Sequence, residues 1–170
     1  MYKHILLPTD GSPLSEKAVE NGIQFAKAMG ARVTGLHVTP RFSVAPLKGW
    51  AHGTSKPRAR LQAIFNEHAK QYIEVIRKMA RAARVPCQCL YLPGGSPYEE
   101  IVKTARNKRC DLIYMASHGR KGASGVVLGS ETVKVIIHSP VPVLVHREPS
   151  LVSDILRVAP RPVRRTATRK

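Results

Sequence analysis

Two kinds of hydrophobic pattern alternate along the chain: short, nearly continuous apolar runs, and longer stretches in which apolar residues recur every three or four positions. The short runs are typical of strands buried on both faces of a parallel sheet, and the longer stretches predict amphipathic helices. Strands that alternate with helices indicate an α/β fold, with a parallel sheet covered by helices on both faces. The predicted strands are residues 3–9, 32–38, 86–92, 111–117 and 141–146.

The first predicted helix carries both a start and a stop signal. Ser12 is a favourable N-cap, Pro13 suits the first helical position, and Gly30 follows the last apolar residue of the stripe. This helix is therefore predicted to run from Pro13 to the residue before Gly30. Its apolar stripe consists of Leu14, Ala18, Gly22, Phe25 and Met29.

Three more helices follow from similar signals. A stripe between residues 61 and 83 predicts a long helix, on which His68 is expected to be a partly buried packing residue and not a ligand. The segment Ser-Pro-Tyr-Glu at 96–99 matches a capping box, which would open a helix through Arg106. Residues 130–138 are predicted to form a short last helix.

The composition fits one globular domain. The chain has 170 residues, of which 43% are hydrophobic, and both values are ordinary for a folded domain. No apolar run approaches the roughly 18 residues of a transmembrane helix, so no membrane insertion is expected. The apolar run within residues 1–10 is too short for a signal peptide, and we therefore expect a cytoplasmic protein.

The chain is strongly basic, with 28 Lys and Arg against 11 Asp and Glu and a formal charge of +17. Residues 41–60 carry five basic residues and no acid, and their prolines and glycines predict a basic loop. Residues 148–170 are predicted to form a basic, flexible C-terminal tail. Both segments either remain solvated or hold nucleic acid, an anionic lipid or an acidic partner.

The three cysteines suggest neither a disulfide framework nor a metal site. The sequence has no Cys-x-x-Cys pair and no His, Asp or Glu cluster with metal-ligand spacing. Cys87 and Cys89 would share one face of a strand, and Cys110 is distant in sequence. All three are predicted to be reduced, buried, small hydrophobic residues.

A glycine-rich segment follows the fourth predicted strand. Four glycines between residues 119 and 129 precede Ser130, and Arg120 and Lys121 add positive charge. Backbone N–H groups in such a segment can turn toward an anion, and the following helix N-terminus favours negative charge, so the segment suits phosphate. It is neither a P-loop nor a dinucleotide fingerprint. A surface loop that simply turns has the same composition, and that alternative stays open.

Several segments together resemble the universal stress protein family, over residues 2 to about 147. The ATP-binding branch of that family has Gly, two residues, Gly, nine residues, then Gly-Ser or Gly-Thr. Gly119, Gly129 and Ser130 fit this pattern, whereas Ala116 takes the place of the first glycine. A methyl group is tolerated there if φ is negative and is costly if φ is positive. The matching segments are Ile-Leu-Leu-Pro-Thr-Asp-Gly-Ser at 5–12, Leu-His-Val at 36–38, Asp-Leu-Ile-Tyr-Met-Ala-Ser-His-Gly at 111–119, Leu-Gly-Ser at 128–130 and Pro-Val-Pro-Val-Leu-Val at 140–145.

The resemblance implies a three-layer α/β sandwich whose five-stranded, open parallel sheet has the order 3-2-1-4-5. It also implies that residues 1–147 form a domain that binds ATP or AMP, with or without Mg²⁺. Asp10 would accept hydrogen bonds from the ribose or base, and Val38 and Met115 would flank the adenine. The implied nucleotide-binding residues are Pro8, Thr9, Asp10, Val38, Met115, Ala116, Gly119, Gly129, Ser130 and Glu131.

Two of these residues have structural alternatives. Gly119, Gly129 and Ser130 would donate hydrogen bonds to the phosphates, with Glu131 beside them, but Ser130 is equally suited to be the N-cap of the last helix. Asp10 could instead serve as a capping acid before the first helix.

The resemblance further implies a homodimer formed through strand 141–146, an apolar strand predicted at the sheet edge, unless the tail covers it. The expected function is that of a dimeric, nucleotide-binding regulator of the stress response. A nucleotide-free module that binds partners through the basic loop and tail is one alternative, and a slow ATP hydrolase is another. No catalytic residue is assigned, because His118 has no acid near it in the sequence and no cysteine has an activating partner.

Overall fold

The computed structural model describes residues 1–40, 56–119 and 128–147. The described strands form one parallel sheet in the order β3-β2-β1-β4-β5. This confirms the α/β fold and the predicted strand order. The elements are β1 (His4–Thr9), α1 (Pro13–Met29), β2 (Arg32–Pro40), α2 (Lys56–Ala83), β3 (Cys87–Gly95), α3 (Pro97–Asn107), β4 (Leu112–Ala116), α4 (Ser130–His138) and β5 (Val143–His146).

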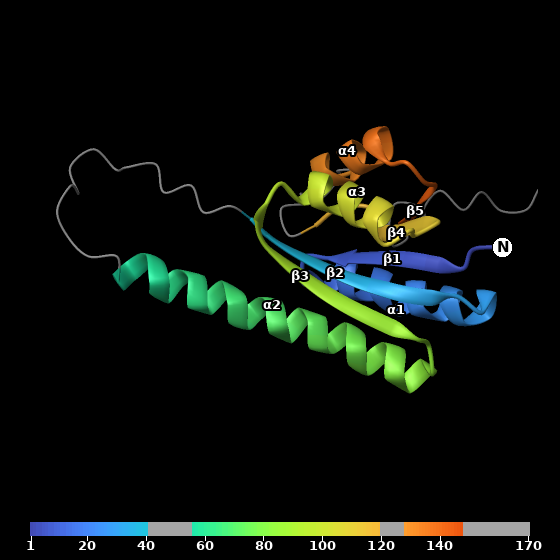
Figure 1. Ribbon diagram of the computed structural model, residues 1–170, viewed down its shortest axis with the longest axis horizontal. Helices are drawn as coiled ribbons and strands as arrows, with labels where there is room; N and C mark the ends of the chain where they lie inside the picture. Colours follow the sequence, from blue (N-terminus) through green and yellow to red (C-terminus); the bar gives the residue numbers. More distant parts are fainter. Residues whose placement is uncertain (41–55, 120–127, 148–170) are drawn as a thin grey trace, which may run out of the picture.

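Helices cover both faces of the sheet, which confirms the three-layer arrangement (Figure 1). One core cluster lies between the sheet and helices α1 and α2, and it includes Ile5, Leu7 and Ile76. A second cluster lies under α3 and α4, and it includes Leu6 and Ile113. Successive strand residues point to opposite faces, so every strand of the sheet centre must be apolar on both sides.

The caps predicted for α1 are confirmed. The backbone N–H of Ser15 donates to Oγ of Ser12 at 3.3 Å, and Gly30 ends the helix in the left-handed conformation with φ of 62°. Residues other than glycine pay a steric cost at such a φ. A local capping signal therefore sets both ends of this helix.

Helix α2 differs from the prediction in two ways. It begins at Lys56, so residues 56–60 are helical and the predicted basic loop is wrong there; residues 41–55 lie outside the described part of the chain. A proline in the first helical turn is compatible with a helix, because its missing N–H would have no intrahelical partner. His68 is exposed and not partly buried, because the buried stripe runs through the adjacent Ala69 instead. The buried stripe comprises Ala69, Ile73, Ile76, Ala80 and Ala83.

The predicted capping box at the start of α3 is also wrong. Ser96 occupies the N-cap position, but its side chain makes no capping hydrogen bond, and Glu99 accepts from the hydroxyl of Tyr98 instead. A carboxylate from α4, that of Glu131, accepts the backbone N–H of Tyr98 at 3.0 Å. A tertiary contact therefore supplies the cap of α3 that the local sequence predicted for Ser96.

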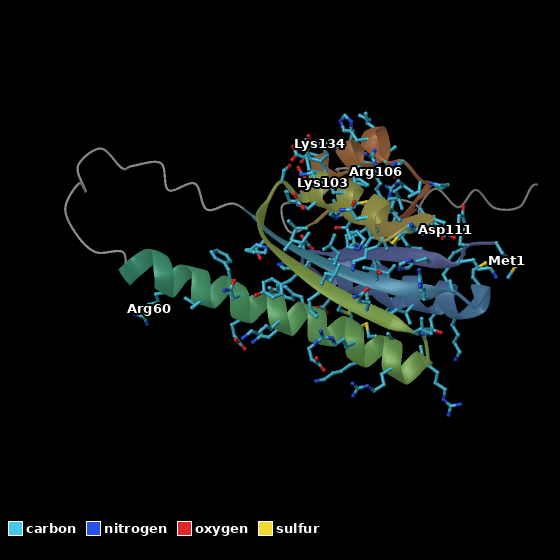
Figure 2. The ribbon with its side chains drawn as sticks, viewed as in Figure 1. Met1, Arg60, Lys103, Arg106, Asp111 and Lys134 are labelled. Carbon is cyan, nitrogen blue, oxygen red and sulfur yellow. The ribbon has the colours of Figure 1, made fainter. Side chains whose placement is uncertain are left out.

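The amino edge of the sheet is held together by Asp111, which directly precedes β4. Its carboxylate accepts the backbone N–H of Lys3 at 2.7 Å and that of His4 at 3.0 Å. Figure 2 shows Asp111 at the same end of the sheet as Met1. These two bonds fix the start of β1 beside the start of β4, so the carboxyl ends of both strands come out together at the opposite edge.

The described cysteines have no disulfide bond. Cys110 is buried as predicted, whereas Cys87 and Cys89 are only half-buried, because β3 is an edge strand. None of the helices in the described part of the chain has both the length and the apolar character that crossing a bilayer requires.

Candidate functional site

The strand order reverses between β1 and β4. In open parallel sheets, ligands bind outside the carboxyl ends of the strands at such a reversal. Here Asp10 follows the end of β1, and Ser117 follows the end of β4. Except for Val38 on β2, the predicted site residues lie at the ends of these two strands, on the segments that follow them or at the start of α4, which makes this edge the candidate site.

Asp10 and Gly119 lie against each other across this edge. One carboxylate oxygen of Asp10, Oδ1, accepts the backbone N–H of Ser12 at 3.0 Å, which supports the capping alternative. The other oxygen, Oδ2, faces Gly119 so closely that a Cβ atom there would overlap it. A side chain at position 119 would therefore displace the carboxylate of Asp10, and glycine allows this close approach. The side chain of Asp10 thus accepts the N–H of the N-cap residue of α1 and lies at the reversal point.

Two hydrogen bonds join the end of β4 to the start of α4. The backbone N–H of Gly129 donates to the carbonyl oxygen of Ser117 at 2.7 Å, and the hydroxyl of Thr132 donates to the carbonyl oxygen of Ala116 at 3.1 Å. Both Ser117 and Thr132 are buried. The N-terminus of α4 is therefore held directly beside the segment that leaves β4.

Gly129, and not Ser130, is the N-cap of α4. Its φ of −73° and ψ of 155° are open to any residue, so glycine is not needed for backbone conformation. Glycine saves space instead, because a Cβ atom would lie 3.1 Å from the Cα atom of His118 and would push it away by a few tenths of an ångström. The N–H of Gly129 already donates to the carbonyl oxygen of Ser117, which competes with the predicted hydrogen bond to a phosphate.

Ser130 is the first helical residue, and the prediction of it as an N-cap is therefore wrong. The first N–H groups of an α-helix have no intrahelical acceptor, and the helix dipole makes this end favourable for an anion. Ser130 is exposed, so its hydroxyl and the N–H groups of the first turn lie at the surface beside Gly119 and Gly129.

The predicted site residues on the strands divide between the two faces of the sheet. Val38 and Met115 pack in the cluster under α3 and α4, and Pro8 alternates onto the same face. Thr9 lies on the other face, where its hydroxyl is 2.9 Å from Oγ of Ser15 in α1. The side chain of Ala116 also points to the α1 face. Thr9 and Ala116 thus lie at the candidate site through their backbone only.

The alanine at position 116 fits its place without strain. Among the described residues, only Arg84 and Arg109 have positive φ outside glycine. Ala116 is buried, and it belongs to the core cluster that also includes Val19 and Tyr114. The methyl group therefore points away from the face that holds Val38 and Met115, and the backbone makes no demand for glycine here.

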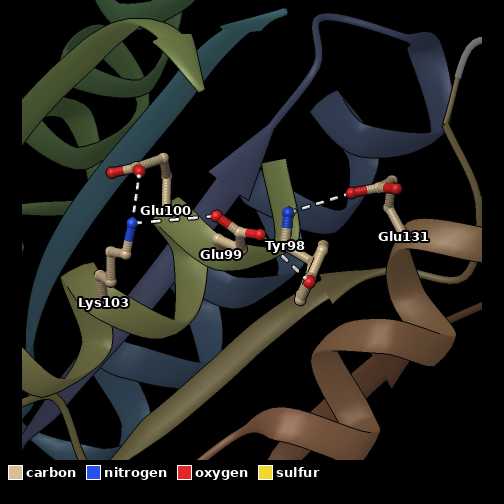
Figure 3. A network of polar contacts seen from close by, with 5 residues as sticks. All are labelled: Tyr98, Glu99, Glu100, Lys103 and Glu131. Atoms are coloured by element: carbon tan, nitrogen blue, oxygen red, sulfur yellow. Dashed lines mark hydrogen bonds and ion pairs between the residues drawn. The ribbon is translucent and has the colours of Figure 1, made fainter. Parts of the chain in front are cut away.

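Glu131 connects the two helices that flank this edge (Figure 3). Its Oε2 atom accepts the N–H of Tyr98 at the start of α3, and its Oε1 atom accepts from Nζ of Lys134 at 2.9 Å. This carboxylate raises the pKa of Lys134, through the hydrogen bond first and the charge attraction second. Its side chain is thus engaged by Tyr98 of α3 and by Lys134 of α4.

Other residues at this edge gave no sequence signal strong enough to single them out. Nδ1 of the buried His37 is 2.8 Å from the carbonyl oxygen of Thr9, and Oγ of Ser117 is 3.2 Å from Nδ1 of His118. In residues 1–40, 56–119 and 128–147, no group of three His, Cys, Asp or Glu side chains is arranged to hold a metal. Arg120 and Lys121 lie outside the described residues.

Comparisons with known proteins identify the family and support the fold. The model of the universal stress protein family matches residues 1–147. Universal stress protein MJ0531 of Methanocaldococcus jannaschii is 33% identical over 150 residues, which cover 88% of this chain and 84% of that relative. The solved structure of hypothetical protein MJ0577, from the same organism, matches with a TM-score of 0.73 and 33% identity, over 88% of this chain and 99% of that one.

Two further solved structures share the fold. A universal stress protein in complex with cAMP has a TM-score of 0.65 at 21% identity, over 87% of this chain and 99% of that one. A protein of the family from Arabidopsis thaliana with AMP bound has a TM-score of 0.61 at 13% identity, over 87% of this chain and 93% of that one. Because the family model spans residues 1–147 and the relative MJ0531 is 33% identical over most of both chains, this chain belongs to the universal stress protein family.

Proposed function

We propose that this chain binds an adenine nucleotide, ATP or AMP, at the carboxyl edge of the sheet between β1 and β4. The observation that carries the proposal is the convergence at this edge of the Asp10 carboxylate, the tightly approached Gly119 and the N-terminus of α4. This edge thereby combines a carboxylate that can accept hydrogen bonds from hydroxyl groups with a helix N-terminus whose N–H groups can donate to an anion. The complexes of two fold relatives with cAMP and with AMP support the choice of ligand.

Each part of the nucleotide would meet matching chemistry. Asp10 would accept hydrogen bonds from the ribose or base, and the apolar face that includes Val38 and Met115 would lie beside the adenine. The phosphates would accept from the first N–H groups of α4 and from the hydroxyl of Ser130. Mg²⁺, where present, would bind mainly through phosphate oxygens and water.

We infer a regulatory role in the stress response and not efficient catalysis. Any hydrolysis of ATP would depend on positioning by the chain and on a Mg²⁺ ion carried by the phosphates, and it should be slow. The cytoplasm is the proposed location, since the described cysteines are free thiols, as is usual in a reducing compartment.

Nucleotide extraction and titration would test the proposal. Protein purified without added nucleotide is extracted with acid, the extract is analysed for ATP and AMP, and stripped protein is titrated calorimetrically with each, with and without Mg²⁺. We expect binding that Asp10→Asn weakens. Asp111→Asn is the matched control, because Asp111 lies at the opposite edge, where its carboxylate binds the N–H groups of Lys3 and His4. No binding at millimolar nucleotide would overturn the proposal.

We also propose that the chain dimerises through β5. This strand ends the sheet, its residues are half-buried, and Ile137 of α4 is 69% exposed. The carbonyls of Pro142 and His146 accept from β4, so in a parallel ladder Val143 and Val145 turn their N–H groups outward. An outward row of this kind is a template for pairing with a second copy.

Substitution of Val145 by proline tests the dimer. It removes one outward N–H while leaving the ladder with β4 intact, because an edge strand tolerates proline on its open side. Light scattering should show the dimer of the parent chain converted to a folded monomer. A dimer that persists in Val145→Pro would exclude this strand as the interface.

The net charge supports a second candidate function. Residues 41–60 and 148–170 hold much of the +17 charge, and an anionic partner such as nucleic acid would suit them. A chain ending at Arg147 should show a flatter salt dependence of DNA or RNA affinity than the full chain. An unchanged slope would exclude binding through the tail.

A further inference from the structure

Cys87 and Cys89 form a pair of thiols at the amino end of β3, far from the candidate nucleotide site along the strand. Their sulfur atoms are 3.5 Å apart, and both residues are half-buried. Residues two apart on a strand point to the same face, and here that face packs against the cluster under α1 and α2. Because β3 is the edge strand, only one side of the pair is covered by another strand.

Packing holds one of the two sulfurs in place. Cys89 pairs in register with Gly35 of β2, and a Cβ atom on Gly35 would lie 3.1 Å from the sulfur of Cys89. The same missing side chain leaves room for Ile76 of α2, whose methyl groups lie above Gly35. The position of the Cys89 sulfur is therefore fixed by both β2 and α2. The sulfur of Cys87 contacts it from the start of β3.

The two thiols are hydrogen-bonded to each other, and this bond shifts their pKa values in opposite directions. The hydrogen bond from Cys87 lowers the pKa of Cys89, burial opposes this shift, and the nearby positive charge of Arg77 adds to it. The same hydrogen bond, with burial, raises the pKa of Cys87. Cys89 is therefore the more readily deprotonated of the two thiols, and the thiolate is the form that binds soft metals and metalloids.

The sulfur separation fits a bridging atom better than a disulfide. Residues two apart on an extended strand have Cα atoms about 6.6 Å apart, near the upper limit of about 6.8 Å for disulfides. An atom bonded to both sulfurs at about 2.3 Å would span the observed 3.5 Å with a bond angle of roughly 100°. That angle suits tetrahedral or pyramidal bonding and is far from the linear geometry of a two-coordinate ion.

The surrounding residues limit which kinds of atom could bridge the two sulfurs. In the described part of the chain, no third His, Cys, Asp or Glu side chain completes a metal-ligand group with these two. A structural Zn²⁺ site needs four ligands, so the pair does not fit it. We propose that Cys87 and Cys89 form a chelating dithiol for a pyramidal, thiophilic centre that brings its own third group, namely a trivalent organic arsenical.

A groove lies at the amino edge of the sheet, near the start of β3. It has a volume of about 410 Å³, and Cys87 is one of its lining residues. The other lining residues are His4, Arg32, Val33, Pro86, Gln88, Asn107, Lys108 and Arg109. The groove lies opposite the edge that carries Asp10 and Gly119, so the proposed dithiol site does not depend on nucleotide binding.

The reaction needs no oxidant or reductant. An arsine oxide, R–As=O, reacts with the two thiols to form two As–S bonds while the As–O bond breaks. The oxygen leaves as water with the two thiol protons, and arsenic remains trivalent. Two sulfurs on one rigid strand act as a chelate, because the second bond forms at a high effective concentration.

Phenylarsine oxide is the probe that tests the proposal. The full chain is treated with one equivalent, and intact-mass analysis follows the phenylarsenic adduct during a wash with excess glutathione, a monothiol. We expect one adduct per chain that resists the wash and is released by 2,3-dimercaptopropanol. Cys110→Ser is the matched control and should behave like the parent chain, because Cys110 is buried elsewhere.

Single variants decide whether chelation occurs. Cys87→Ser and Cys89→Ser should each lose the glutathione-resistant adduct, with retention weaker by about 100-fold or more. Circular dichroism and urea unfolding show whether each variant is folded, and a variant that does not fold is replaced by the alanine variant at the same position. A resistant adduct in either folded single variant, or no resistant adduct in the parent chain, would overturn the proposal.

Discussion

Substitution of Gly129 by alanine is the sharpest test of how the candidate site is built. The backbone of Gly129, with φ of −73° and ψ of 155°, accepts alanine without strain. The new methyl carbon, however, would lie 3.1 Å from Cα and 3.2 Å from Cβ of His118. Carbon atoms pack best at about 3.5–4.0 Å, so residues 117–118 must move away from α4.

The expected effect on stability is small because opposing effects nearly cancel. Alanine restricts the unfolded chain, which raises the free energy of unfolding by about 0.4–1 kcal/mol. Alanine is a poorer N-cap than glycine, which lowers it by about 0.5–1 kcal/mol. With the crowding against His118 included, we expect a net loss of about 1 kcal/mol or less, a small part of a typical stability of about 5–15 kcal/mol.

The expected effect on ligand binding is larger. The segment after β4 and the start of α4 would no longer face one ligand together, and ATP affinity should fall by about tenfold, or about 1.4 kcal/mol. Calorimetric titration measures this affinity, and urea unfolding measures stability in the same samples.

Gly30→Ala provides the control for stability loss. Gly30 has φ of 62° with open space around it, so alanine there costs about 1–2 kcal/mol through backbone strain alone. It lies at the opposite edge of the sheet, and ATP affinity should be unchanged. Binding by Gly129→Ala with the affinity of the parent chain would refute the reasoning, and so would an equal loss of affinity in Gly30→Ala.

Three further predictions concern other parts of the fold. Glu131→Gln replaces the charged acceptor of the Tyr98 N–H and should lower the free energy of unfolding by about 0.5–1 kcal/mol. ATP affinity should be nearly unchanged, and a large loss of affinity would show instead that this carboxylate contacts the ligand. Burial, and then the charge of Arg32, lower the pKa of His4 in the folded chain. The unfolded chain therefore binds more protons below pH 6.5. As the pH is lowered in this range, the free energy of unfolding should fall by up to about 1.4 kcal/mol per pH unit. In His4→Gln this slope, measured by urea unfolding between pH 5 and 7, should be flatter, and an equal slope would assign the effect to other groups. Leu36→Ala removes a fully buried side chain and should lower the free energy of unfolding by about 2–5 kcal/mol, and a loss below 1 kcal/mol would contradict the packing described for the sheet centre.

The sequence alone was sufficient for the elements and for the fold class. Strands buried on both faces must be continuously apolar, and the first helix carries its own cap at Ser12 and its own stop at Gly30. Such signals act between residues close in the chain, so they survive without knowledge of the fold. The motif around Gly119, Gly129 and Ser130 also lies at the reversal point of the sheet, where the resemblance to the family implied a site.

The tertiary structure alone decided which local signals were used. Ser96 does not cap α3, because Glu131 from another helix reaches the N–H of Tyr98 instead. His68 is exposed because the face of α2 that meets the sheet is set by packing on β2 and β3, and periodicity leaves that face uncertain by one position.

The two proposed sites show the same difference between local sequence signals and tertiary packing. Asp10 and Gly119 are 109 positions apart in the chain, and only the pairing of β1 with β4 brings them together. Cys87 and Cys89 are visibly close in the sequence, but only the packing of Cys89 over Gly35 sets the distance between their sulfur atoms. Local chemistry therefore determined what each segment becomes, and long-range packing determined which groups meet, because close approach depends on atoms that the chain order does not place together.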